Sequence, residues 1–271
     1  MLIDTHCHIN MMVKKEFDVV LTSEQITQAH TVVAQAAQNK VTTIINVGTS
    51  LIESKNCITL AQNNPSVFAA IGIHPNDLTN NWSADLKELV SLLKDTKKNK
   101  IVGIGECGLD FHYPEYNLQR QKDAFKAHIE ITLEHNLGLI VHTRDAPDET
   151  LRCLEEFKGQ ITRGIIHCFS EKQDFARTVI DWGFVIGIGG IITYPKNNYL
   201  REIVSSIKLS DFVLETDAPF LPIQSMRGQQ NSPQYIFNIA QYIAQLREEP
   251  LEKIAGETTA NAQRIFNLFY V

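Results

Sequence analysis

The sequence lacks a Cys-x-x-Cys pair, and its five cysteines are an odd number scattered along the chain. This pattern argues against a disulfide framework and against a structural zinc site built from paired cysteines. The sequence also has no apolar run long enough to cross a membrane, and no basic segment with a hydrophobic stretch precedes the first predicted strand. We therefore expect a cytoplasmic protein without a membrane partner. We also expect a monomer.

Positive charge is also in short supply. The 25 lysines and arginines are outnumbered by 31 aspartates and glutamates, which gives a net charge of −6. This balance argues against a surface that binds nucleic acid through charge alone, although it permits a local site for one phosphate. The 271 residues contain no linker, low-complexity run or change of composition, so we predict a single domain over residues 1–271.

Eight short apolar runs recur along the chain, and each is rich in Val, Ile, Leu or Gly. This composition is typical of strands that are covered on both faces. The predicted strands are Leu2–Ile9, Thr42–Gly48, Val67–His74, Ile101–Asp110, Gly138–Thr143, Gly164–Phe169, Phe184–Gly190 and Phe212–Thr216.

Helix-length amphipathic segments separate these runs, with capping residues and glycines where helix ends require them. Ser83 and Ser170, for example, are expected N-caps. The C-terminal Leu251–Phe269 is predicted to form two short helices packed on the outside. The other predicted helices are Glu24–Gln38, Leu51–Gln62, Ala84–Leu93, Asn117–His135, Asp145–Phe157, Glu171–Trp182, Asn197–Ile207 and Pro233–Arg247.

Eight successive β/α units predict an α/β fold, namely a closed parallel (β/α)8 barrel of the TIM type. A doubly wound open sheet is the alternative. Two long loops, Asn10–Ser23 after the first strand and Pro219–Ser232 after the eighth, depart from the short connections of the other units. In such a barrel the reactive groups belong at the carboxyl ends of the strands.

Side chains that can bind metal recur at those strand ends. His6 and His8 are two residues apart on one strand, so they point to the same side. Carboxylates in apolar runs cost several kcal/mol unless they are paired or bound to metal. The expected metal ligands are His6, His8, Glu106, His142, His167 and Asp217.

Six ligands exceed the four that one tetrahedral zinc ion accepts, so we predict two divalent cations that share Glu106. Such mixed nitrogen and oxygen ligands admit Zn, Mg, Mn or Ni. One ion is assigned to His6, His8, Glu106 and Asp217, and the other to Glu106, His142 and His167.

Cysteines and glycines beside these motifs have simpler expected roles. Cys7, Cys107 and Cys168 each adjoin an expected ligand, so the pleat should turn them outward into the helix layer as inert hydrophobic residues. The Gly187–Gly190 segment lacks the rest of a nucleotide-binding fingerprint. We expect its glycines to leave room for substrate at the barrel mouth.

The motifs DTHCH, GIHP, GECGLDF, VHTRDA, HCFS and ETDAPFL, followed by RG, resemble in order the motifs of the TatD family of metal-dependent hydrolases. That family belongs to the amidohydrolase superfamily of distorted (β/α)8 barrels. The resemblance implies a divalent-metal deoxyribonuclease, often a 3′→5′ exonuclease, with DNA as its substrate, single-stranded or at 3′ ends. By motif, the family's metal ligands correspond to His6, His8, Glu106, His142, His167 and Asp217.

Two departures from the family pattern lie near the mouth. Glu171 replaces a glycine after HCFS, and Ser232 replaces a glutamate between Asn231 and Pro233. Neither is a ligand, but both are placed to alter how substrate is handled. The candidate substrate contacts are His74, His112, Arg144 and Arg227. Each also has a structural alternative, as a satisfied histidine, a surface residue or a salt-bridge partner.

The function predicted from these observations is metal-assisted phosphodiester hydrolysis, with Glu106 and Asp217 as the catalytic carboxylates. Bound ions lower the pKa of water towards 7, and Asp217 is the candidate to take its proton. One alternative is a binuclear hydrolase of a small ester, lactone or amide, although no lysine on the fourth strand offers the carbamylated bridge of such enzymes. The other is a non-catalytic protein that binds metal or nucleic acid.

Overall fold

Eight parallel strands, hydrogen-bonded in chain order, form the centre of the molecule in the computed structural model, which describes residues 1–268. The sheet curls into a nearly closed barrel, so the (β/α)8 prediction is confirmed and the open sheet is excluded. The strands are β1 (Leu2–Cys7), β2 (Val41–Val47), β3 (Val67–Ile71), β4 (Ile101–Asp110), β5 (Gly138–Arg144), β6 (Gly164–Ile166), β7 (Phe184–Ile188) and β8 (Phe212–Leu214).

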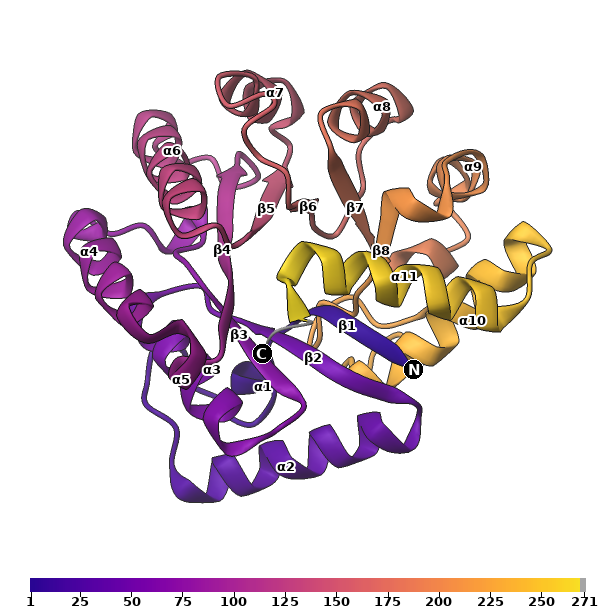
Figure 1. Ribbon diagram of the computed structural model, residues 1–271, viewed down its shortest axis with the longest axis horizontal. Coiled ribbons are helices and arrows are strands. Elements are labelled where there is room, and N and C mark those ends of the chain that lie inside the picture. The colour runs from indigo at the N-terminus through magenta and orange to yellow at the C-terminus, as the bar shows by residue number, and fades with distance from the viewer. Residues whose placement is uncertain (269–271) are drawn as a thin grey trace.

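Most of the helices form a ring outside the strands (Figure 1). Capping explains several of their starts: Thr22 and Gln25 form a capping box at the start of α2, and Ser50 caps α3. Ser83 and Ser170 are not N-caps, because the helices near them begin at Trp82 and Gln173. These outer helices are α1 (Ile9–Met12), α2 (Ser23–Gln38), α3 (Leu51–Asn63), α4 (Trp82–Leu92), α5 (Thr96–Asn99), α6 (Leu118–His135), α7 (Pro147–Glu155), α8 (Gln173–Asp181), α9 (Asn198–Ser206) and α10 (Ile236–Arg247).

The seam between β1 and β8 closes through a few specific hydrogen bonds. The strands share a single bridge, Cys7 with Ala218, beyond the end of β8. Below it the buried Asp4 carboxyl accepts from the Thr216 hydroxyl at 2.6 Å and from the Thr216 amide at 3.0 Å, and the Thr5 hydroxyl donates to the Leu214 carbonyl. Burial raises the pKa of Asp4 to about 8, although the hydrogen bonds from Thr216 and from the His6 amide oppose the shift. Side chains therefore join the barrel where the ladder is weakest.

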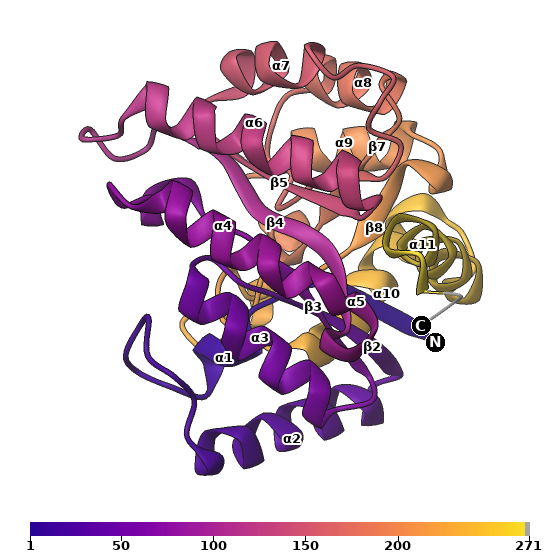
Figure 2. The same cartoon turned by 60° about the vertical axis from the view of Figure 1, so that its left-hand side comes forward.

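The amino-terminal end of the barrel is closed by one helix, α11 (Leu251–Phe266). The prediction of two short helices outside the barrel is therefore wrong, and its last residue, Phe269, lies outside the described residues. Figure 1 shows α11 crossing the barrel end, and Figure 2 shows it almost end on. Ala262, Ile265 and Phe266 pack against apolar side chains from inside the barrel, because an open barrel end would leave those side chains in water.

Several strands end before the apolar runs that predicted them. β6 stops at Ile166 and β8 at Leu214, so His167 and Asp217 lie in the segments that follow. Of the two predicted long loops, the first overlaps the short helix α1, which begins at Ile9, and the second contains a 3₁₀ turn, Gln224–Met226. Among residues 1–268, no helix combines the length and the hydrophobicity that a bilayer crossing requires.

Candidate metal centre

Glu106 lies at the middle of the barrel mouth because β4 is irregular there. The pairing of β4 with β5 shifts register between Ile104 and Cys107, and such an irregularity re-aims a side chain. Gly105 has φ +136°, and a Cβ atom at this position would lie 2.5 Å from the Ile140 carbonyl oxygen. A glycine is therefore required immediately before Glu106.

The two oxygens of Glu106 face different groups of histidines. Oε2 lies 3.3 Å from His6 Nε2 and 3.7 Å from His8 Nε2. Oε1 lies 2.7 Å from His142 Nδ1 and 2.8 Å from His167 Nε2. Glu106 therefore stands between two sets of imidazoles, as a shared ligand would.

Asp217 completes the first set. Its Oδ1 lies 3.4 Å from His8 Nε2 and 3.7 Å from His6 Nε2, and these two nitrogens are themselves 3.1 Å apart. Its amide donates to the His6 carbonyl, which ties the segment after β8 to β1. All six expected ligands thus converge in one cluster, although their role as ligands stays a prediction.

The donor set fits divalent metal ions. Imidazole nitrogens and carboxylate oxygens meet at short range, and they are ligands for zinc, nickel and manganese. Burial disfavours ionised Glu106, but the nearby His167 and a hydrogen bond with His142 outweigh it and hold its pKa well below the usual value. Burial likewise opposes ionisation of Asp217, but the hydrogen bond with His8 and the nearby His167 help to offset it, and the pKa is again lowered. Both carboxylates are therefore in the form that binds metal.

Two of the histidines are oriented from behind by an acceptor. His8 Nδ1 lies 2.8 Å from the Val47 carbonyl oxygen, and His142 Nε2 lies 3.2 Å from Asp110 Oδ2. Asp110 also accepts from the His112 amide and from Asn76, and these bonds, with His142, hold its pKa at about 2 against the effect of burial. Asp110 was not among the residues predicted from the sequence. Its position at the end of a strand buried throughout was the available signal.

The cluster opens into a cavity of about 660 Å³. His74 and Arg144, two of the four candidate substrate contacts, line it. His74 Nε2 is 3.6 Å from Glu106 Oε1, and burial together with the nearby His142 lowers the pKa of His74 to about 3, so this imidazole is neutral. His74 therefore presents an uncharged polar group beside the expected ligands.

The other two candidate contacts lie elsewhere. His112 pairs with Asp145 at 3.0 Å, and both side chains are largely exposed. The Arg227 guanidinium lies 4.8 Å from the centre of the Tyr194 ring. Neither residue is part of the cavity wall, so in this conformation the structure does not bring them to the site.

The cysteine expectation holds for two residues and fails for the third. Cys7 and Cys107 are buried in the core between strands and helices. Cys168 lines the cavity, because β6 has ended two residues earlier and the backbone turns there with φ +47°. Once the strand ends, the pleat no longer determines which way a side chain points.

Three half-exposed aromatic residues stand around the cavity: Phe17, Tyr113 and Phe220. They come from the segments after β1, β4 and β8. In Figure 2 the segments after β1 and β4 project on the side away from α11. The Arg144 guanidinium lies 5.9 Å from the centre of the Tyr113 ring. Three exposed aromatic rings therefore surround a cavity that also includes the carboxylates and histidines of the cluster.

A parallel (β/α)8 barrel with imidazoles and carboxylates clustered at its strand ends defines the class of barrel-shaped metal-dependent hydrolases. Comparison with known proteins agrees. The family described as TatD related DNase matches residues 3–267, and this chain belongs to the TatD family. The metal-dependent hydrolase YabD of Bacillus subtilis is 33% identical over 268 residues, which are 99% of this chain and 100% of YabD.

Two further relatives extend the comparison. The protein named 3′-5′ ssDNA/RNA exonuclease TatD in Citrobacter rodentium is 32% identical over 259 residues, covering 93% of this chain and 97% of that protein. The crystal structure of YjjV, a TatD homologue from Escherichia coli K12, superimposes with a TM-score of 0.87 at 28% identity and covers 98% of each chain. The resemblance inferred from the sequence motifs is therefore confirmed at the level of family and fold.

Proposed function

We propose that this protein is a divalent-metal-dependent deoxyribonuclease that cleaves phosphodiester bonds from 3′ ends of single-stranded DNA. The observation that carries the proposal is that the two oxygens of Glu106 face two different sets of expected ligands, below a cavity surrounded by exposed aromatic rings. The exonuclease named in Citrobacter rodentium, 32% identical, supports this choice of substrate.

The proposed ligands divide into two sets around Glu106. His6, His8, Asp217 and Glu106 would hold one ion, and His142, His167 and Glu106 would hold the other. When bound, divalent ions supply Lewis acidity that activates water and neutralises charge on the phosphate. Zn, Mg, Mn and Ni all suit this donor set.

The chain itself supplies proton transfer and positioning. Asp217 is ionised and lines the cavity, so it can accept the proton of an attacking water. Arg144 reaches the same cavity and offers a planar pair of donors for a phosphate. Neutral His74 offers a hydrogen bond without adding charge.

The exposed aromatic rings around the cavity support a polynucleotide substrate rather than a small ester. Bases stack on aromatic rings whatever their identity, and such stacking needs exposed rings like Phe17, Tyr113 and Phe220. With a net charge of −6, the protein relies on local contacts to hold a nucleic acid.

A digestion time course tests the proposal. Protein stripped with a chelator is reloaded with Mg, Mn, Zn or Ni and incubated with single-stranded DNA labelled at the 5′ or the 3′ end. We expect metal-dependent loss of the 3′ label first. Hydrolysis of chromogenic esters or lactones without DNA cleavage would favour the small-substrate hydrolase, for which the cavity volume is adequate. DNA binding without cleavage would favour a binding protein.

A further inference from the structure

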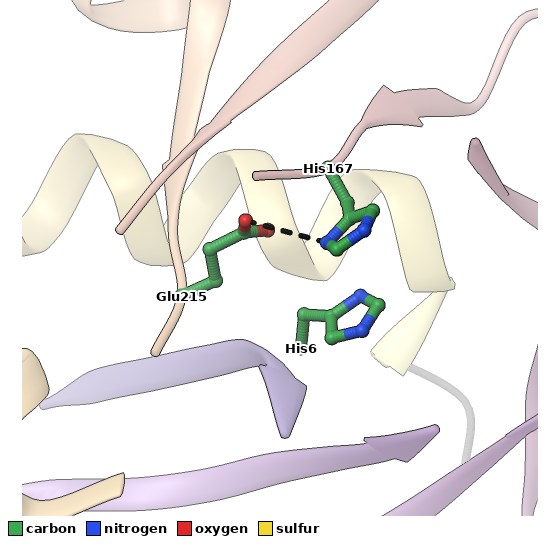
Figure 3. A group of neighbouring side chains, drawn as sticks. All are labelled: His6, His167 and Glu215. Carbon is green, nitrogen blue, oxygen red and sulfur yellow. Dashed lines mark ion pairs between the residues drawn. The ribbon is translucent and has the colours of Figure 1, made fainter. Parts of the chain in front are cut away.

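A buried carboxylate that the proposed mechanism does not use lies behind the ligand cluster. Glu215 follows β8, has no exposed surface, and points at His167, whose ring stacks on His6 with centroids 3.9 Å apart (Figure 3). Its Oε1 lies 3.7 Å from His167 Nδ1 and accepts the Cys168 amide. Within residues 1–268, Glu215 Oε2 and His167 Nδ1 have no hydrogen-bond partner.

The barrel keeps space for this side chain. Gly187 on the neighbouring strand β7 faces it, and a Cβ atom at Gly187 would overlap Glu215 Oε2. The expectation that Gly187 leaves room for substrate is therefore wrong, because the carboxylate of Glu215 occupies that room. A buried carboxylate is unfavourable unless a partner compensates for its lost hydration. Among the described residues, His167 is the basic side chain within ion-pair distance of Glu215.

We propose that Glu215 is a positioning residue that holds the ring proton of His167 on Nδ1, which leaves the lone pair of Nε2 free for metal. This inference rests on the ligand assignment in the proposed function. Nε2 is the atom that faces Glu106 Oε1, at 2.8 Å. An acceptor behind a ligating histidine fixes its tautomer and raises its basicity, and losing such an acceptor commonly costs about 10- to 100-fold in metal affinity.

The same oxygen also fixes the backbone that carries His167. Cys168 has φ +47°, a conformation that non-glycine residues seldom adopt, and its amide donates to Glu215 Oε1. Glu215 thus contacts both the ring and the turn after β6. Glu215 stands behind His167 as the Val47 carbonyl stands behind His8 and Asp110 behind His142. Three of the four expected histidine ligands therefore have an acceptor on the side of the ring away from the expected metal.

The test is metal binding without substrate, so that it does not depend on nuclease activity. Glu215→Gln keeps the size of the side chain and an acceptor for the Cys168 amide, but it removes the charge. We expect the ion on His142 and His167 to bind about 10- to 100-fold more weakly, measured by chelator competition with Zn²⁺. The other ion should bind with unchanged affinity. In zinc-loaded protein, we expect the Nδ1 proton of His167 to exchange faster in the variant, as seen by NMR.

Two further variants complete the design. Glu53→Gln removes another fully buried carboxylate, which bonds Asn10 and Lys14, and it should lower stability while leaving both metal affinities unchanged. Glu215→Asp retains the charge and should keep part of the metal affinity that Glu215→Gln loses. It also provides a second measurement if Glu215→Gln does not fold. Two unchanged affinities in Glu215→Gln, or equal losses at both ions, would overturn the inference. A wild-type protein that binds a single ion would instead overturn the ligand assignment.

Discussion

The two ends of the barrel differ in composition and in what they do. At the amino-terminal end, α11 covers a layer of Val, Ile, Ala and Phe side chains. At the carboxyl-terminal end, histidines and carboxylates converge on Glu106 beneath a cavity. We call the amino-terminal end the floor and the carboxyl-terminal end the rim. The difference indicates that the floor contributes stability and the rim contributes the chemistry, so substitutions at the two ends should have separable effects.

The rim nevertheless depends on hydrogen bonds to residues buried beneath it. His128 on α6 is fully buried, and its Nε2 accepts the Ile73 amide at 3.1 Å, directly before His74. Asp4 joins the seam from which His6 and Asp217 emerge. Hydrogen bonds to buried groups thus help to hold the polar mouth in place.

The largest effect is expected from Glu106→Gln at the rim. Because both ligand sets use this carboxylate, the variant should lose both ions and its hydrolytic activity should fall by at least about 10³-fold. Metal content and the DNA digestion rate measure the two effects. Glu130→Gln, an exposed carboxylate on α6, is the matched control and should behave as wild type. Full metal content and full rate in Glu106→Gln would show that this residue is not shared.

The next effect is expected at the floor. Phe266→Ala empties a site that is 2% exposed, and it should lower the free energy of unfolding by about 3–5 kcal/mol. Urea unfolding measures this loss, and Phe266→Leu should lose less than about 1.5 kcal/mol. Metal affinity of the folded variant should stay at the wild-type value. A large change in that affinity would show that floor and rim are coupled.

The pH dependence of stability tests the contribution of the buried His128 beneath the rim. Burial lowers the pKa of His128 to about 4, although the Ala124 carbonyl partly opposes this shift. A folded-state pKa below the unfolded value of 6.5 means that the stabilisation is present above pH 6.5 and is lost as the pH falls towards 4, by at most about 3 kcal/mol.

The measurement compares urea unfolding of wild type and His128→Gln between pH 7 and pH 4.5. Other titrating groups cancel in the difference between the two proteins. We expect the wild type to lose its advantage over the variant as the pH falls. A difference that stays constant over this range would contradict the lowered pKa.

The smallest effect is expected from the exposed aromatic residues around the cavity. Phe220→Ala should weaken binding of single-stranded DNA by about 1–3 kcal/mol, seen as a higher KM with little change in kcat. Tyr116 is also exposed but stacks on Phe111 and does not line the cavity, so Tyr116→Ala is the control. An equal effect of both variants would argue against a stacking role for Phe220.

The sequence predicted the barrel well because its signals are local. Apolar runs identify strands, and six ligand candidates fall near strand ends in a fold whose parallel strands all finish at one side. The exact strand ends were less predictable. In β6, for instance, the apolar run continues to Phe169 while the ladder stops at Ile166, since hydrophobicity reports burial and not hydrogen bonding.

Long-range partners could not be predicted. The position of α11 was missed because an amphipathic pattern identifies an apolar face but not the surface that it covers. Glu215 and Gly187 were missed as a pair because nothing local links a glycine on β7 with a carboxylate after β8. Asp110 likewise acquires its meaning from His142, 32 residues away.

The most direct test of the account is anomalous diffraction from crystals of the protein loaded with zinc or manganese. The account predicts two peaks, one on each side of Glu106, the first contacted by His6, His8 and Asp217 and the second by His142 and His167. A single peak that Glu106 does not touch, or two peaks away from these residues, would contradict it.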